Sequence, residues 1–169
     1  MKPSVHGLHH ITCIAGNAQE NLDFYVGVLG MRLVKRSVNQ DAPDTYHLFY
    51  ADGAGSPGTD LTFFPWPAMG PGRLGTGLAV EVSLAVPSGS LAYWQDRLDR
   101  HGVAHGAVEN RFGEATLPFV DPHDLALTLV GTGWTQTAKP TFSPDHAILY
   151  RRAVGVLDQA KNKLTAGDL

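Results

Sequence analysis

The spacing of apolar positions predicts a strand followed by a helix at the start of the chain. The strand pattern covers residues 8–15, and Asn17 directly after it is a typical helix N-cap. Four apolar side chains then recur at the i, i+3, i+4, i+7 spacing of a buried helical stripe, namely Leu22, Tyr25, Val26 and Leu29. Gly30 predicts the end of this helix.

Three strand patterns follow this helix. They cover residues 31–38, 45–50 and 60–64, and turn-forming residues separate them. A connector rich in proline and glycine then runs from Pro65 to Gly77. The first part of the chain therefore predicts one βαβββ unit.

The same order of patterns returns after the connector. A strand is predicted over residues 78–86, and the helix that follows has Ser88 or Ser90 as its expected N-cap and ends at Gly102. The buried stripe of this helix consists of Leu91, Trp94 and Leu98. Three more strands are predicted over residues 103–108, 115–120 and 125–130.

Two such units predict an α+β fold. The expected modules are residues 1–67 and 68–139, followed by a linker-like tail over residues 140–169 with room for a short helix. Each four-stranded sheet is expected to curve, with its helix on the outside. Laid edge to edge, the two sheets would form a cupped, barrel-like mixed sheet around a cavity for a small organic ligand.

The composition excludes several classes of protein. The 169 residues carry a formal net charge of −3, and no run of Lys or Arg indicates binding to nucleic acid or to an anionic membrane. No apolar stretch is long enough to span a bilayer, and no hydrophobic signal core opens the chain. Cys13 is the only cysteine, so an internal disulfide is excluded and a cytoplasmic protein is expected.

Two adjacent histidines, His9 and His10, are the main candidates for chemistry. They lie in a strand pattern, and alternation would send their rings to opposite faces of the sheet. Only one ring could then enter a cavity, where a neutral imidazole nitrogen can bind a divalent metal. The other histidine could support this metal ligand without binding the metal itself. The alternative interpretation is one hydrogen-bonded core histidine and one exposed histidine.

Several motifs of the first unit are specific when taken together. They are GLHHIT at residues 7–12, NLDFY at 21–25, LVK at 33–35, TYHLFY at 45–50, SPGT at 56–59 and LTFFPW at 61–66. With the tandem units, they resemble the vicinal oxygen chelate superfamily, which includes glyoxalases, bleomycin-resistance proteins and extradiol dioxygenases. The similarity covers residues 5–148 and is closest to the amino-terminal half of hydroquinone-type ring-cleaving dioxygenases.

The resemblance implies a non-haem centre that holds Fe(II), or less often Mn(II), with two histidines and one carboxylate. It implies that His10 is a metal ligand and that His9 is a catalytic group next to the substrate, a hydroquinone- or catechol-type aromatic. Independently of the resemblance, His47 is a further candidate ligand. It lies in an alternating strand, which would turn its ring either into the cup, where it could bind a metal, or away from it.

The remaining ligands are not evident. The family draws its second His and its Glu from a half that this chain does not contain, and Thr62 and Thr128 stand where a superfamily carboxylate usually falls. Matching the strands of the two units places Glu81 opposite His10, which makes Glu81 a candidate ligand. Matching the helices instead selects Ala79.

Three functional hypotheses therefore remain. In the first, a homodimer completes the metal site and the protein cleaves aromatic rings. In the second, the chain is a non-catalytic, small-molecule binding protein similar to bleomycin-resistance proteins. The third and weakest is an inactive remnant. The tail after residues 145–148 lacks the further His-bearing strand that the resemblance implies, so the chain corresponds to one half of such a protein.

Overall fold

The structure is a computed structural model that describes residues 8–56 and 58–133. It divides into two compact units between Met69 and Gly70. Each unit contains one strand, one helical segment and three further strands in that order, which confirms the predicted α+β fold with tandem βαβββ modules. The predicted tail over residues 140–169 lies outside the described residues.

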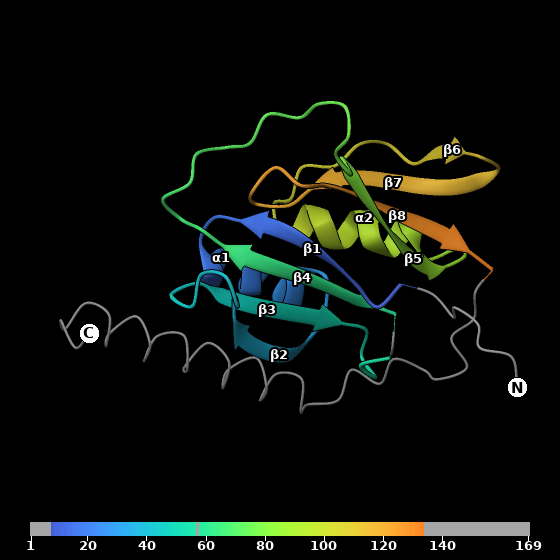
Figure 1. Cartoon of the computed structure of the whole chain (residues 1–169). Coiled ribbons are helices and arrows are strands. Elements are labelled where there is room, and N and C mark those ends of the chain that lie inside the picture. Colours follow the sequence, from blue (N-terminus) through green and yellow to red (C-terminus); the bar gives the residue numbers. More distant parts are fainter. Residues whose placement is uncertain (1–7, 57, 134–169) are drawn as a thin grey trace, which may run out of the picture. The chain divides into compact units, whose positions relative to one another are not determined.

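The first unit contains one open, four-stranded sheet. Its strands are β1 (His10–Ala15), β2 (Arg32–Val38), β3 (Tyr46–Ala51) and β4 (Asp60–Pro65). Their order across the sheet is β1-β4-β3-β2, so the strand that begins at His10 lies at an edge (Figure 1). β1 pairs with β4 in parallel, whereas the other neighbouring strands are antiparallel.

The helical segment of the first unit begins at the predicted cap. The Asn17 side chain accepts hydrogen bonds from the backbone N–H groups of Gln19 and Glu20 at 2.8 and 3.2 Å, which satisfies two donors at the helix start. α1 (Ala18–Leu22) continues directly into a π-helical segment, η1 (Asp23–Val28). The wider turn changes the buried stripe, because Phe24 and Val28 are buried while the predicted Val26 is only half-buried.

The core of the first unit lies between this helical segment and one face of the sheet. Tyr25 of η1, Tyr50 of β3 and Phe63 of β4 are fully buried. The ring centroid of Tyr25 lies 4.6 Å from that of Phe63 and 5.2 Å from that of Tyr50. The Tyr50 hydroxyl donates to Asn21 Oδ1 at 2.9 Å, so this buried hydroxyl is paired within the core.

The second unit repeats this topology. Its elements are β5 (Glu81–Pro87), α2 (Leu91–Arg100), β6 (Glu109–Arg111), β7 (Glu114–Val120) and β8 (Ala126–Thr132). The strand order is β5-β8-β7-β6, and β5 pairs with β8 in parallel (Figure 1). Its core is formed by Val82, Val86, Leu91, Leu98, Leu117, Phe119, Leu127 and Leu129.

The start of the second unit differs in detail from the sequence prediction. The strand expected from Leu78 begins at Glu81 instead, and Leu78 is exposed. Ser90 occupies the N-cap position of α2, but its hydroxyl donates to the Pro87 carbonyl at 2.6 Å and does not accept from the helix. This helix end therefore lacks the side-chain cap that Asn17 supplies in the first unit.

The strand predicted over residues 103–108 is wrong. This segment makes one isolated bridge, between His105 and Phe119, and regular pairing starts only at Glu109. β6 is consequently short and lies further along the chain than the apolar pattern indicated.

A tight turn fixes where β6 pairs. Phe112 and Gly113 both have positive φ angles, 54° and 86°, and the side chain of Asn110 accepts a hydrogen bond from the Gly113 N–H at 3.1 Å. Two central residues with positive φ form the turn that joins adjacent antiparallel strands most tightly. The turn places Arg111 opposite Glu114 and so determines the register of β6 and β7.

The helices of the described ranges are short. None of them has both the length and the apolar character that a bilayer-crossing helix requires.

Candidate functional site

The face of the first sheet that points away from α1 and η1, the far face, gathers the chemistry-bearing residues. Thr12 pairs with Thr62, Thr62 with Phe49, and Phe49 with Lys35, and paired residues of a sheet project on the same side. Alternation along each strand adds further members to this row. The residues of the far face that matter below are His10, Thr12, Lys35, His47, Phe49, Thr62 and Phe64.

The two adjacent histidines contact each other, which differs from the alternation expected from the sequence. The Nδ1 atoms of His9 and His10 are 2.8 Å apart. The physical reason is that β1 begins only at His10, so His9 is not bound by strand geometry and its ring can turn toward its neighbour. His10 is exposed, and within the described residues its Nε2 makes no hydrogen bond. That nitrogen is available to an external ligand.

His47 is oriented toward the far face. Its Nε2 lies 2.9 Å from Thr62 Oγ1, and the Thr62 hydroxyl in turn donates to Thr12 Oγ1 at 2.9 Å. Burial lowers the pKa of His47, and the electrostatic effects of nearby His10 and Lys35 lower it further. The imidazole is therefore predominantly neutral at pH 7, and its Nε2 is occupied by Thr62.

Aromatic rings surround this imidazole. The ring centroids of Phe49 and Phe64 lie 4.1 and 4.3 Å from that of His47. The His10 ring is 6.3 Å from His47 and 6.1 Å from Phe49, so these rings form a continuous group. The Lys35 ammonium lies 5.0 Å from the centroid of Phe49. The far face thus presents flat apolar surfaces beside nitrogen and hydroxyl groups.

In the second unit, Glu81 holds the position that corresponds to His10. His10 starts β1 and pairs with Asp60, the first residue of β4, while Glu81 starts β5 and pairs with Ala126, the first residue of β8. The link to the helix is longer in the second unit, since α1 starts eight positions after His10 and α2 ten positions after Glu81. The strand register therefore selects Glu81, and the alternative match to Ala79 reflects only this longer link.

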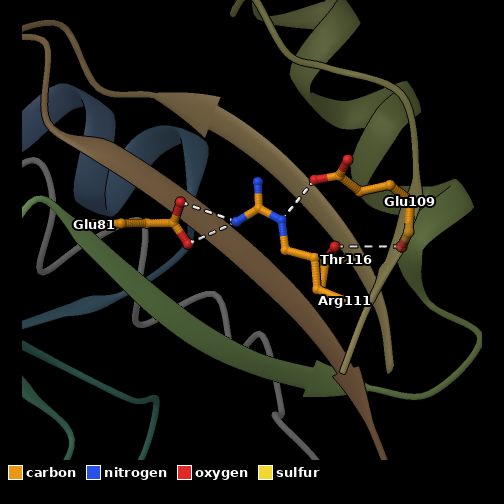
Figure 2. Close-up of polar contacts among 4 residues, drawn as sticks. All are labelled: Glu81, Glu109, Arg111 and Thr116. Atoms are coloured by element: carbon orange, nitrogen blue, oxygen red, sulfur yellow. Dashed lines mark hydrogen bonds and ion pairs between the residues drawn. The ribbon is translucent and has the colours of Figure 1, made fainter. Parts of the chain in front are cut away.

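The Glu81 carboxylate already has a cationic partner within its own unit. Arg111 Nη1 lies 3.1 Å from both carboxylate oxygens of Glu81, and Arg111 Nε donates to Glu109 Oε1 at 2.6 Å (Figure 2). Burial raises the pKa of Glu81, but the hydrogen bonds and the positive charge of Arg111 outweigh it, so the pKa lies below its usual range.

Replacing Arg111 by methionine is expected to raise the pKa of Glu81 toward that of an ordinary glutamate. A carboxylate with a depressed pKa stabilises the fold above its unfolded pKa of about 4.3 and loses this contribution as pH falls through the folded pKa. The stability of the Arg111→Met variant should therefore fall less steeply on acidification than that of the wild type. A ¹³C NMR titration of the Glu81 carboxyl and urea unfolding between pH 3 and 7, about the range in which a glutamate titrates, measure the two effects.

The matched control is Arg100→Met, because Arg100 pairs with the exposed Asp96 at 2.8 Å in the same unit. Exposed ion pairs of this kind contribute little, so this variant should leave the titration of Glu81 unchanged. An identical Glu81 pKa in Arg111→Met and in the wild type would contradict the role of the guanidinium.

The described residues do not fit a complete three-ligand metal centre. Within residues 8–56 and 58–133, no group of three or more His, Cys, Asp or Glu side chains is close enough to hold one ion. Thr62 and Thr128 occupy the third position of the last strand in their units, and a neutral hydroxyl is a weaker ligand than a carboxylate. His10 offers one free nitrogen, whereas Glu81 is bound to Arg111.

Sequence reasoning missed several parts of the site. The hydroxyl pair of Thr12 and Thr62 was detectable, since Thr12 follows His10 by two positions and so shares its face. The aromatic neighbours Phe49 and Phe64 were detectable in the same way. The sequence did not indicate Arg111 as a partner of Glu81, because the strand that carries Arg111 was predicted over residues 103–108.

Comparison with known proteins reveals relatives that are about twice as long. The chain is 46% identical over 151 residues to "Putative ring-cleaving dioxygenase MhqO" of Bacillus subtilis (strain 168), a match that covers 88% of this chain and 48% of that protein. It is 42% identical over 120 residues to chlorohydroquinone/hydroquinone 1,2-dioxygenase of Sphingobium indicum, covering 70% of this chain and 37% of that protein. The chain thus spans about half the length of these relatives or less.

A solved structure and a family model agree with these relatives. The crystal structure of a "putative dioxygenase from Bacillus subtilis subsp. subtilis str. 168" has a TM-score of 0.75 and 46% sequence identity, over 82% of this chain and 44% of that one. The model of the Glyoxalase/Bleomycin resistance protein/Dioxygenase superfamily matches residues 7–168, nearly the whole chain. The chain belongs to the glyoxalase/bleomycin resistance protein/dioxygenase superfamily.

Proposed function

We propose that the chain binds a small aromatic ligand of the hydroquinone or catechol type on the far face of its first unit, as part of a ring-cleaving dioxygenase. The observation that carries this proposal is the group of rings formed by His10, His47, Phe49 and Phe64 next to the hydroxyls of Thr12 and Thr62. The names of the relatives point to the same class of ligand, since one of them acts on hydroquinones.

The chemistry of an aromatic diol suits this surface. Ring–ring contacts contribute about 0.5–1.5 kcal/mol beyond the burial of apolar area, and Phe49 and Phe64 supply such ring faces. The ring oxygens of a diol need hydrogen-bond partners once water is displaced, and the Thr12 hydroxyl lies on the same face as His10 and can supply one. A saturated ligand of similar size would use only part of this surface.

We propose His10 as one ligand of a divalent metal ion, with Fe(II) expected and Mn(II) as the second choice. The support is its free Nε2 together with the contact between His9 and the Nδ1 atom of His10, which restrains the ring as second groups around metal-binding histidines do. His9 is accordingly proposed as a catalytic group beside the ligand. Glu81 could contribute only after leaving Arg111, and His47 only through Nδ1, because its Nε2 is taken.

A complete centre needs ligands that the described residues do not bring together. We propose a second copy of the chain, in a homodimer, as their source. The same shortage supports the second candidate function, a protein of this superfamily that binds aromatic molecules without transforming them. The two functions differ in whether the purified chain retains a metal ion.

The test is metal and ligand binding by the anaerobically purified chain. Wild-type protein should bind Fe(II) or Mn(II) in calorimetric titration, and His10→Ala should bind it at least about tenfold more weakly, since loss of even a supporting group costs 10–100-fold. Replacing His101, the exposed residue at the end of α2, by alanine is the matched control and should change nothing. Oxygen uptake with hydroquinone or catechol then tests for catalytic activity. Size-exclusion chromatography tests whether the chain is a dimer.

The outcomes are distinct. Metal retention that depends on His10 together with oxygen uptake supports the dioxygenase. Binding of catechol or hydroquinone without metal retention supports the binding protein. Failure of the wild-type chain to bind either diol would overturn the proposal in both forms.

A further inference from the structure

Three side chains of the far face form a chain of hydrogen bonds with a defined direction. His47 Nε2 lies 2.9 Å from Thr62 Oγ1, and the Thr62 hydroxyl donates to Thr12 Oγ1 at 2.9 Å. A threonine hydroxyl has a single hydrogen. Because Thr62 gives this hydrogen to Thr12, the hydrogen between His47 and Thr62 must belong to the imidazole Nε2. This holds for the neutral and for the charged ring alike.

The first two members of this chain are held rigidly. Thr62 is fully buried on β4, a strand with neighbours on both sides. The His47 ring is packed against the rings of Phe49 and Phe64, with centroids 4.1 and 4.3 Å away. Packed side chains of this kind keep one rotamer, so the distances between the heavy atoms of this chain of hydrogen bonds are fixed in the folded unit.

The last member, Thr12, ends at the surface. Thr12 is exposed, and within the described part of the chain its hydroxyl hydrogen is not used in any other hydrogen bond. Since Thr12 Oγ1 already accepts from Thr62, the hydrogen that remains is free to donate. Thr12 also follows His10 by two positions on β1, which places the two side chains about 7 Å apart on one face.

We infer that His47 and Thr62 are positioning residues that orient the Thr12 hydroxyl as a hydrogen-bond donor to a ring oxygen of the aromatic ligand. The inference rests on the proposed function, because it concerns the same ligand on the same face. It assigns to the ligand an oxygen that accepts a hydrogen bond, such as a phenolic or phenolate oxygen, next to His10. It also gives His47 a role through Thr62 that needs no metal ion.

The binding test uses Thr62→Val, which keeps the shape of the side chain but removes the hydroxyl, and Thr62→Ser, which keeps the hydroxyl. In calorimetric titration with catechol and with hydroquinone, Thr62→Val should raise the Kd about tenfold, corresponding to about 1.4 kcal/mol and to the usual size of one hydrogen bond. Thr62→Ser should remain within about twofold of the wild type, well below that effect. Circular dichroism checks that both variants are folded.

A second readout does not depend on any ligand. ¹⁵N NMR of the imidazole nitrogens should show the Nε2–H form of His47 in the wild type and in Thr62→Ser, with a mixture of forms in Thr62→Val. The Nδ1–H form in the wild type would overturn the inference, because Thr62 would then be donating to His47.

The binding results separate this inference from the proposed function. Wild-type binding that Thr62→Val leaves unchanged overturns the inference alone, and the proposed function stands. Absence of diol binding by the wild type overturns both. Binding that weakens in Thr62→Val and is restored in Thr62→Ser, together with the Nε2–H form, supports both.

Discussion

Replacing Phe63 by alanine is expected to destabilise the first unit by about 3–5 kcal/mol, the usual cost of removing a buried phenylalanine ring. Phe63 is fully buried, and its ring centroid lies 4.6 Å from that of Tyr25 and 5.9 Å from that of Tyr50. The surrounding rings are held by strands and helix and cannot collapse fully into the space left behind. Because small domains are stable by only about 5–15 kcal/mol, this loss would remove a substantial part of the free energy of unfolding.

Urea unfolding followed by tyrosine fluorescence and circular dichroism measures this effect. The matched control is Phe112→Ala, since Phe112 is a fully exposed phenylalanine at the turn between β6 and β7. This variant removes the same atoms without creating a cavity and should change stability by less than about 0.5 kcal/mol. Similar losses in the two variants would show that the ring cluster does not stabilise the unit.

Replacing Tyr50 by phenylalanine is expected to cost about 1–3 kcal/mol, the penalty for leaving a buried polar group without its partner. The Tyr50 hydroxyl donates to Asn21 Oδ1 at 2.9 Å, and both residues are fully buried. Burial and the nearby Asp23 raise the pKa of Tyr50 well above the usual range, so the hydroxyl keeps its proton at neutral pH and remains a donor.

The double variant Tyr50→Phe/Asn21→Leu isolates the unpaired amide as the cause. Once both polar partners are replaced by apolar side chains of similar shape, no buried group is left unsatisfied. The double variant should therefore be more stable than the sum of the two single variants predicts, with a coupling of about 1 kcal/mol or more in a thermodynamic cycle. Strict additivity would contradict the argument.

The fold follows from the sequence because its signals are local and repeated. The apolar stripe from Leu22 to Leu29 and the cap at Asn17 place the first helical segment correctly, and the duplicated order of patterns predicts the second unit. What fails is the strand over residues 103–108. The position of β6 depends on the positive φ angles at Phe112 and Gly113, and Phe112 carries no sequence signal for that conformation.

The site is less predictable, because it depends on how neighbouring strands pair. The alternation of side chains along a strand does not determine on which face of the sheet the His47 ring lies. Only the register of β3 against β4 places this ring beside Thr62. The expected opposition of His9 and His10 fails because a strand boundary falls between them. Glu81 illustrates the same limit, since its partner Arg111 lies thirty positions away on a strand that the sequence misplaces.

The parallel pairing of β1 with β4 has a consequence for synthesis of the chain. Paired residues such as His10 and Asp60 are fifty positions apart, which at roughly 5–20 residues per second separates their emergence from the ribosome by about 3–10 seconds. During this interval the first strand has no hydrogen-bonding partner within its own sheet, because β4 is its only neighbour there. The earliest translated part of the site is therefore among the last to be fixed in the folded unit.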